Sequence, residues 1–169
     1  MARPQPGDYG NFYENYVQKV QGNSLREAIE RHAEELNSFY SSLPEAKADY
    51  RYETGKWSLK DLLQHVIDTE RIMSYRILRL ARKDNTPLPG FDENTYALQA
   101  DASSRSFESL KQEFLALRKS TDLLLHSFTE AQLNNAGTAN AHRTTALAIG
   151  FIIFGHMLHH KEVIETRYL

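Results

Sequence analysis

Apolar residues recur every three or four positions in four separate stretches of the chain. This spacing places them along one face of an α-helix, so each stretch predicts an amphipathic helix. Pro44 ends the first stretch, and Ser58 with Asp61 three residues later resembles a capping box at the start of the second. No stretch alternates as a half-buried strand does, which favours an all-α four-helix bundle. The predicted helices span residues 24–43, 58–82, 106–128 and 144–168.

The segments between these helices differ in length and composition. Residues 84–105 contain two prolines and a glycine and are too long for a tight turn, which predicts a long crossover connection. Residues 1–23 are rich in Pro, Gly, Tyr and Asn, and we expect an aromatic segment that covers the bundle, with a short helix near residues 12–20. Residues 129–143 are polar and predict a flexible connection. We expect residues 1–169 to form a single domain.

The composition argues against several classes of protein. The net charge is −2, from 20 basic and 22 acidic residues mixed along the chain, so the basic patch of a nucleic-acid-binding protein is missing. There is no cysteine, which excludes disulfides, thiolate metal sites and a cysteine nucleophile. The longest apolar stretch, residues 146–154, is well short of the ~18 residues that predict a membrane span. The start of the chain lacks the apolar core of a signal peptide, so we expect a cytoplasmic protein.

Three of the seven histidines crowd into five residues of the last predicted helix. A helix turns about 100° per residue, so His156 and His160 lie about 40° apart, and His156 and His159 about 60° apart. An i, i+4 pair of imidazoles can converge on one metal ion, but spacing alone does not choose between His159 and His160. The third ligand must come from a facing helix, where His65 is the best candidate. Three protein ligands with positions left for water are typical of catalytic zinc.

The alternative is that these histidines are core residues with hydrogen-bond partners. A buried polar group without a partner costs about 1–3 kcal/mol, so two imidazoles on one buried face need an explanation of either kind. His32 lies on the inner face of the first predicted helix, and a core role is the preferred interpretation there. His126 and His142 lie near predicted helix ends and are expected at the surface.

Three further residues are candidates because of their positions. Asp68 follows His65 by three residues, on nearly the same helix face, so it is the nearest candidate to orient a ligand or handle a proton; the alternative is a surface aspartate. Glu70 points about 140° away from His65, into an apolar face, which predicts a buried ion pair with an arginine of another helix. Gly155 lies inside a predicted helix, where glycine costs about 1 kcal/mol relative to alanine. Close helix packing would explain it, and the simpler alternative is a loosened helix.

Several of these stretches resemble one known family, the DinB-like proteins. The likeness extends over roughly residues 8–169, and its motifs are fairly specific in combination although each alone is weak. The matching motifs are Gly55-Lys-Trp-Ser58, His65-Val-Ile-Asp68-Thr-Glu70-Arg71, Tyr75-Arg76, Pro87-Leu-Pro-Gly-Phe91, Gly155-His156-Met-Leu-His159-His160 and Glu165-Thr-Arg-Tyr168.

The resemblance implies a four-helix bundle with a long crossover and one divalent metal ion. The family's three ligand histidines match His65, His156 and His160, which selects His160 over His159. The ion would be Zn, Ni, Fe or Mn, because imidazole suits several of these metals alike. Members of the family often pair, so a homodimer is compatible with the resemblance.

The resemblance leaves the chemistry open. Members are described as metal-dependent hydrolases, and relatives use low-molecular-weight thiols as transferases or isomerases. We therefore expect a metal-dependent enzyme on small molecules, either a hydrolase or a thiol S-transferase whose thiol comes from a cosubstrate. The alternatives are a non-catalytic metal-binding or stress-related interaction module, and a purely structural bundle. Neither a nucleic acid nor a membrane is expected as a partner.

Overall fold

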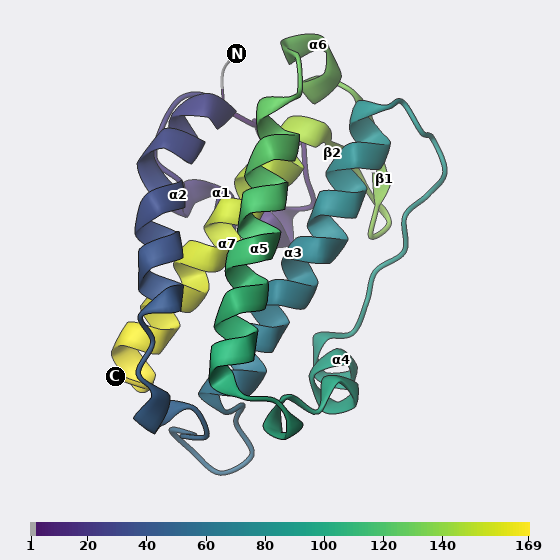
Figure 1. The fold of residues 1–169 in the computed structure, drawn as a ribbon. Coiled ribbons are helices and arrows are strands. Elements are labelled where there is room, and N and C mark those ends of the chain that lie inside the picture. The colour runs from purple at the N-terminus through teal and green to yellow at the C-terminus, as the bar shows by residue number, and fades with distance from the viewer. Residues whose placement is uncertain (1–2) are drawn as a thin grey trace.

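The computed structural model describes residues 3–169; Met1 and Ala2, the first residues of the predicted covering segment, lie outside this range. The bundle consists of four long helices (Figure 1), and the predicted four-helix architecture is confirmed. Each of these helices begins and ends within two residues of its predicted limits. They are α2 Leu25–Ser41, α3 Leu59–Ala81, α5 Phe107–His126 and α7 Ala146–Arg167.

The order of the helices around the bundle depends on the crossover. Helix α3 packs between α5 and α7, and α2 packs between the same two helices on the opposite side. After α3, the chain returns along the outside of the bundle to the end where α3 began, so α3 and α5 run in the same direction (Figure 1). The predicted long crossover is therefore present. It carries helix α4, Glu93–Ala100, and a 3₁₀ turn, Ala102–Ser104, beside α3.

The start of α3 follows the sequence signal closely. The Ser58 hydroxyl accepts a hydrogen bond from the Asp61 backbone N–H, and the Asp61 carboxylate accepts one from the Ser58 N–H. This reciprocal pair is a capping box that satisfies two N–H groups at the helix start. The Tyr168 hydroxyl, at the end of α7, donates to the Trp57 carbonyl at 2.8 Å. Trp57 is thereby fixed against the end of the bundle just before α3 begins.

The connection over residues 129–143, predicted from its composition to be flexible, contains regular elements that the sequence did not predict. This segment contains the short helix α6, Glu130–Leu133, and a hairpin of strands β1, Ala136–Ala139, and β2, His142–Thr145. The hairpin turns at Asn140 and Ala141, which both have positive φ. Such two-residue turns usually contain glycine, and the strands have only four residues each, so the usual sequence signals are missing.

The hairpin also holds the crossover in place. The Leu88 N–H donates to the Thr138 carbonyl, and the Asn140 N–H donates to the Leu88 carbonyl, both at 2.9 Å. These two hydrogen bonds attach the crossover to β1 just before Gly90 and Phe91. The Pro89 carbonyl then accepts a hydrogen bond from Arg76, so the residues that follow Leu88 are held beside α3.

The N-terminal residues lie over α7. A 3₁₀ turn, Asn11–Tyr13, leads into helix α1, Glu14–Lys19, which packs against α7. This confirms the short helix predicted near residues 12–20. Because α1 covers the outer side of α7, the first twelve residues of α7, Ala146–Met157, are all buried. No helix among residues 3–169 is both long and apolar enough to cross a membrane.

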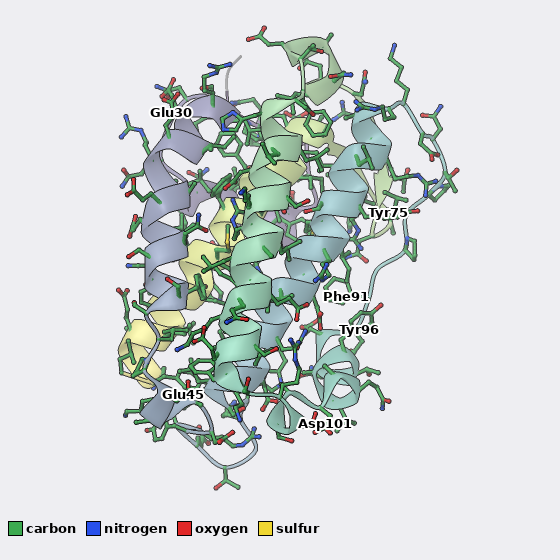
Figure 2. All side chains as sticks on the ribbon, in the orientation of Figure 1. Glu30, Glu45, Tyr75, Phe91, Tyr96 and Asp101 are labelled. Carbon is green, nitrogen blue, oxygen red and sulfur yellow. The ribbon has the colours of Figure 1, made fainter. Side chains whose placement is uncertain are left out.

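Charged side chains mostly lie on the outside of the bundle, as Glu30 and Glu45 do in Figure 2. One exception is an ion cluster between α3 and α5. Arg118 is fully buried and donates to the Glu70 carboxylate at 2.9 Å, and it also pairs with Asp122. The predicted buried ion pair of Glu70 with an arginine of another helix is confirmed.

Candidate metal centre and its pocket

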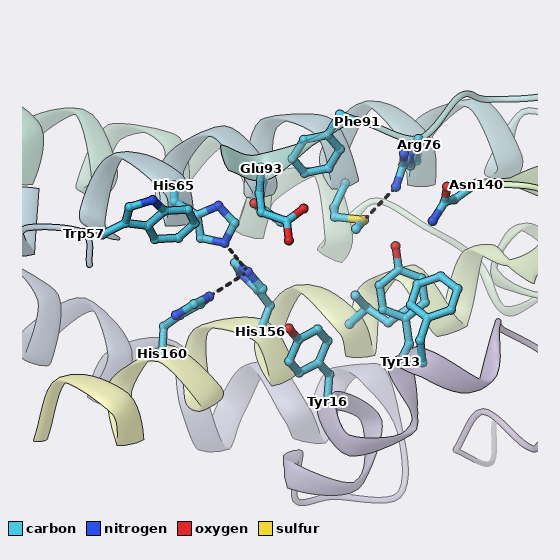
Figure 3. A pocket seen from close by; sticks show the side chains of 15 residues that line it. Tyr13, Tyr16, Trp57, His65, Arg76, Phe91, Glu93, Asn140, His156 and His160 are labelled. Carbon is cyan, nitrogen blue, oxygen red and sulfur yellow. Dashed lines mark hydrogen bonds between the residues drawn. The ribbon is translucent and has the colours of Figure 1, made fainter. Parts of the chain in front are cut away.

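Three histidines from two facing helices meet inside the bundle. His65 lies in the second turn of α3, and His156 and His160 lie one turn apart on α7. The Nε2 atom of His156 is 3.0 Å from the Nε2 of His65 and 3.1 Å from the Nε2 of His160 (Figure 3). One nitrogen of each ring lies within 4.8 Å of the other two. The predicted three-histidine cluster is thus present in the structure.

The environment of these rings favours their neutral form. Burial lowers the pKa of His65 to about 4, with a smaller contribution from the nearby His159. Burial, together with the neighbouring imidazoles, also holds the pKa values of His156 and His160 well below the ordinary histidine value. Neutral imidazoles carry a free lone pair, which is the form that ligates metal ions.

The cluster lies in the wall of a pocket of about 440 Å³. Trp57 packs beside His65, with ring centroids 4.8 Å apart, and Tyr16 meets His156 edge-on at 5.5 Å. Further along the pocket, α3 also supplies Arg76 and the crossover supplies Phe91, so Arg76 lies at the end away from the histidines (Figure 3). The histidines therefore face a cavity that is large enough for a small molecule.

Gly155 explains how Tyr16 reaches this position. A Cβ atom at residue 155 would lie 2.1 Å from the Tyr16 carbonyl oxygen, so only glycine lets the backbone of α1 approach α7 this closely. Close packing, and not a loosened helix, accounts for this glycine. The same contact places the Tyr16 ring over the His156 imidazole, so the glycine beside the cluster also shapes the pocket wall.

The remaining histidines are not members of the cluster. His159 is the nearest of them, with its ring centroid 5.0 Å from that of His160 and 5.4 Å from that of Tyr16, but it lines a separate groove. His32 is buried, and its Nε2 accepts a hydrogen bond from the Gln21 backbone N–H, as a core histidine would. His126 and His142 are exposed, as expected.

The structure does not bring Asp68 into the histidine pocket. Its carboxylate accepts a hydrogen bond from the Gln64 side chain at 2.9 Å and lines a second cavity, between α3 and α4. Burial raises the pKa of Asp68, while the Gln64 hydrogen bond and the nearby Arg71 oppose this shift. No hydrogen bond joins Asp68 to His65, His156 or His160 in residues 3–169.

The carboxylate that does line the histidine pocket is Glu93, at the start of α4. Figure 3 shows its side chain pointing into the pocket between His65 and Phe91. Its negative charge is close enough to Tyr16 and Tyr13 to raise the pKa values of both phenols, although burial is the larger cause. Sequence reasoning missed Glu93 because its place depends on the crossover. The only signal was its position two residues after the Pro87–Phe91 motif.

Comparisons with known proteins agree with this architecture. A family model described as the DinB superfamily matches residues 28–164, which include all three histidines. The chain belongs to this superfamily. As a DinB superfamily member, it has the bundle and the three-histidine cluster within the matched range. The covering segment with Tyr13 and Tyr16 lies outside that range.

Two individual relatives illustrate the likeness. The protein named "Putative metal-dependent hydrolase OB0413", from Oceanobacillus iheyensis, is 28% identical over 109 residues, which are 64% of this chain and 62% of the relative. The structure of YfiT from Bacillus subtilis, described as "a probable metal-dependent hydrolase with an unusual four-helix bundle topology", superposes with a TM-score of 0.70. That superposition covers 98% of this chain and 91% of YfiT at 15% identity, so it supports the shared fold alone.

The cluster has the properties of a divalent metal site. The Nε2 atom of His156 faces two other ring nitrogens, and its one lone pair or one hydrogen cannot serve both contacts well. A cation among the three nitrogens would satisfy all of them. Three imidazoles are a donor set that zinc, nickel and iron accept. The residues present therefore fit the metal that the fold family implies.

Proposed function

We propose that this protein is a metal-dependent hydrolase of small molecules, with one divalent ion held by His65, His156 and His160. The observation that carries the proposal is the cluster of three imidazole rings in the wall of a pocket. The ion would be Zn, Ni, Fe or Mn, and imidazole ligands suit the first three of these metals best. The description of OB0413 as a metal-dependent hydrolase supports the reaction class.

A divalent ion at this site would polarise a carbonyl or phosphoryl oxygen of the substrate and lower the pKa of water. The protein itself must then accept a proton and keep bulk water away. Glu93 is the carboxylate that lines the pocket, so we assign proton transfer to its side chain. Trp57 and Tyr16 cover the histidines from two sides and limit access by water.

A catalytic role for Asp68 stays a prediction, and it competes with the role of Glu93. Asp68 lies on α3 close in sequence to His65 but lines a different cavity. The two assignments differ in a measurable way, because Glu93→Gln and Asp68→Asn each remove one negative charge without changing the size of the side chain. Only the group that transfers the proton should reduce kcat strongly when it is neutralised.

The test is a hydrolysis screen with chromogenic esters, amides and phosphoesters, using protein loaded separately with Zn, Ni, Fe or Mn. We expect turnover that chelation and His156→Ala both abolish. Glu93→Gln should lower kcat by about 10²- to 10⁴-fold while the bound metal is retained, and Asp68→Asn should change it little. A large loss in Asp68→Asn alone would transfer the role to Asp68. If none of the metal-loaded forms turns over any substrate class, the proposal of a hydrolase is wrong.

Thiol transfer is the competing reaction that the family resemblance implies. The chain has no cysteine, so a thiol would have to be supplied as a cosubstrate. Addition of a low-molecular-weight thiol to cobalt-substituted protein should leave its visible spectrum unchanged if the enzyme is a hydrolase. A shift in that spectrum would indicate a thiol at the metal and favour transfer. A homodimer and a cytoplasmic location stay predictions, which sedimentation and cell fractionation would test.

A further inference from the structure

The pocket that contains the histidines also contains a buried arginine without an acidic partner. Two arginines of residues 3–169 are buried, Arg76 at 2% and Arg118 at 0% exposure. Arg118 pairs with two carboxylates, Glu70 and Asp122, whereas no carboxylate of residues 3–169 lies within ion-pair distance of Arg76. Burying a charge is costly unless an opposite charge or a strong set of hydrogen bonds compensates it.

The contacts of Arg76 leave part of its guanidinium group directed at the pocket. One nitrogen donates to the Pro89 carbonyl at 2.5 Å, and another faces the weakly accepting sulfur of Met73 at 3.7 Å. The Phe91 ring lies on one side of the guanidinium, at 5.9 Å. A guanidinium group has five N–H donors, so these contacts leave donors for a ligand.

Two uncharged polar groups lie beside Arg76 at this end of the pocket (Figure 3). The Tyr13 hydroxyl points towards the guanidinium, whose charge opposes the burial-driven rise in the pKa of Tyr13. Asn140, at the hairpin turn, packs its side-chain oxygen against Gly90. A Cβ atom at residue 90 would lie 2.3 Å from this oxygen. Figure 3 shows the amide nitrogen of Asn140 turned towards the pocket. Arginine, phenol and amide together offer several hydrogen-bond donors in one place.

We infer that Arg76, Tyr13 and Asn140 form a subsite for the anionic group, a carboxylate or a phosphate, of the molecule that binds in this pocket. The inference rests on the proposed function for the other end of the pocket, where the histidines would act on the bond to be cleaved. Arginine recognises carboxylate and phosphate through paired hydrogen bonds, which fix the orientation of a ligand. The substrate is therefore a small anion whose charged group is separated from its hydrolysable bond.

The subsite can be tested without metal or catalysis. Trp57 is the chain's single tryptophan and lines the same pocket, so its fluorescence reports on ligands that enter. The probes are benzoate, phenyl phosphate and neutral benzyl alcohol, titrated into the metal-free protein. We expect at least one of the two anions to bind saturably, and which of them binds more tightly decides between a carboxylate and a phosphate. Benzyl alcohol should bind much more weakly.

Arg76→Met should weaken the binding of the preferred anion by roughly 10- to 100-fold, the range for losing a hydrogen bond to a charged group. The matched control is Arg82→Met, which removes the same charge from an exposed position at the end of α3 and should change binding less than about twofold. Equal losses in both variants, or no binding of either anion to the wild-type protein, would overturn the subsite.

A second variant is needed because Arg76→Met removes a buried side chain. Asn140→Asp keeps a residue that tolerates positive φ and adds a negative charge beside the subsite, so it should weaken anion binding without unfolding the hairpin. Undiminished binding in folded Asn140→Asp would count against the subsite. Failure of the proposed hydrolysis gives a different result: the metal-loaded protein would show no turnover, but the metal-free protein would still bind the anion through Arg76.

Discussion

Helix α3 carries two buried polar clusters with opposite designs. His65 faces α7, where it meets two further imidazoles, and Glu70, five residues later, faces α5, where it meets Arg118. The ion cluster contains charges of both signs that compensate one another. The histidine cluster contains three groups of the same kind, and it opens into a pocket.

The difference indicates what each cluster is for. Burial raises the pKa of Glu70, and the Arg118 charge opposes this shift and favours the ionised pair. The charges of the ion cluster therefore compensate one another without any ligand. In the histidine cluster, burial and mutual repulsion both lower the pKa values, so the rings stay neutral with lone pairs available. Such a cluster adds little to stability by itself and gains most from a cation supplied from outside.

The largest effect should come from removing one imidazole. We expect His156→Ala to lose its bound divalent ion, with an affinity loss greater than the 10- to 100-fold typical of changes to groups that only orient a ligand. Elemental analysis of the untagged protein measures the metal content directly. His65→Ala and His160→Ala should be analysed beside it and should lose the ion too. The matched control is His159→Ala, one turn from His156 but outside the cluster, which should keep its metal. Full metal content in His156→Ala would refute the assignment.

The second effect tests the ion cluster. Arg118→Met leaves the Glu70 carboxylate buried without its partner, so we expect the free energy of unfolding to fall by about 3–5 kcal/mol. Denaturant unfolding of the metal-free protein measures it. Folded Arg118→Met should still bind one metal ion, because Arg118 lies on α5 and meets Glu70 on the face of α3 that is turned away from His65. A loss of metal from the folded variant would show that the two clusters are coupled.

Replacing both partners separates a structural role from a functional one. Glu70→Leu combined with Arg118→Met removes both charges, so the loss of stability should be much smaller than for Arg118→Met alone. No equivalent pair exists in the histidine cluster, since removing more imidazoles only removes more ligands. Equal stabilities of the single and double variants would mean that packing, and not charge, dominates at Arg118.

The two clusters also differ in how far the sequence predicts them. The 3.6-residue period determines which face of α3 each residue occupies, so both the helix limits and the partner type of Glu70 followed from spacing. The same period placed Asp68 near His65, but the structure turns its carboxylate to Gln64 and a different cavity. Angular spacing along one helix does not say which neighbouring helix a side chain meets.

The rest of the pocket depends on segments without a regular period. Glu93 lines the histidine pocket because the crossover is tied to a hairpin that the sequence did not predict. Asn140 occupies a turn with positive φ and no glycine, and Tyr16 depends on a backbone contact with Gly155. These are long-range contacts between irregular segments, for which local hydrophobic patterns carry no information.

The third effect tests that backbone contact. Gly155→Ala would place a methyl group against the Tyr16 carbonyl, so we expect a loss of about 1–3 kcal/mol in the free energy of unfolding and an altered pocket wall. Gly150→Ala is the matched control in the same helix, because the atoms nearest to its methyl belong to the flexible Leu25 side chain and not to a backbone. That variant should be nearly neutral, since alanine is favoured over glycine in a helix. Equal losses in both would show that the α1 contact has no special role.

The smallest effect distinguishes a core histidine from the cluster. Burial lowers the pKa of His32 below its ordinary value of 6.5, so below that pH the unfolded chain binds a proton that the folded protein does not. Its contribution to the free energy of unfolding is therefore lost as the pH falls from 6.5 towards the folded pKa, by at most about 1.4 kcal/mol per pH unit. His32→Leu should lower stability at pH 7.5, because the Gln21 N–H loses its acceptor, and should show a shallower decline towards pH 5.5.

Chemical denaturation of both metal-loaded proteins at the two pH values measures the difference, and parallel pH profiles would show that His32 titrates alike in the folded and unfolded states. Metal content should be the same in both proteins, because His32 lies outside the three-histidine cluster and its Nε2 atom accepts its hydrogen bond from the Gln21 backbone.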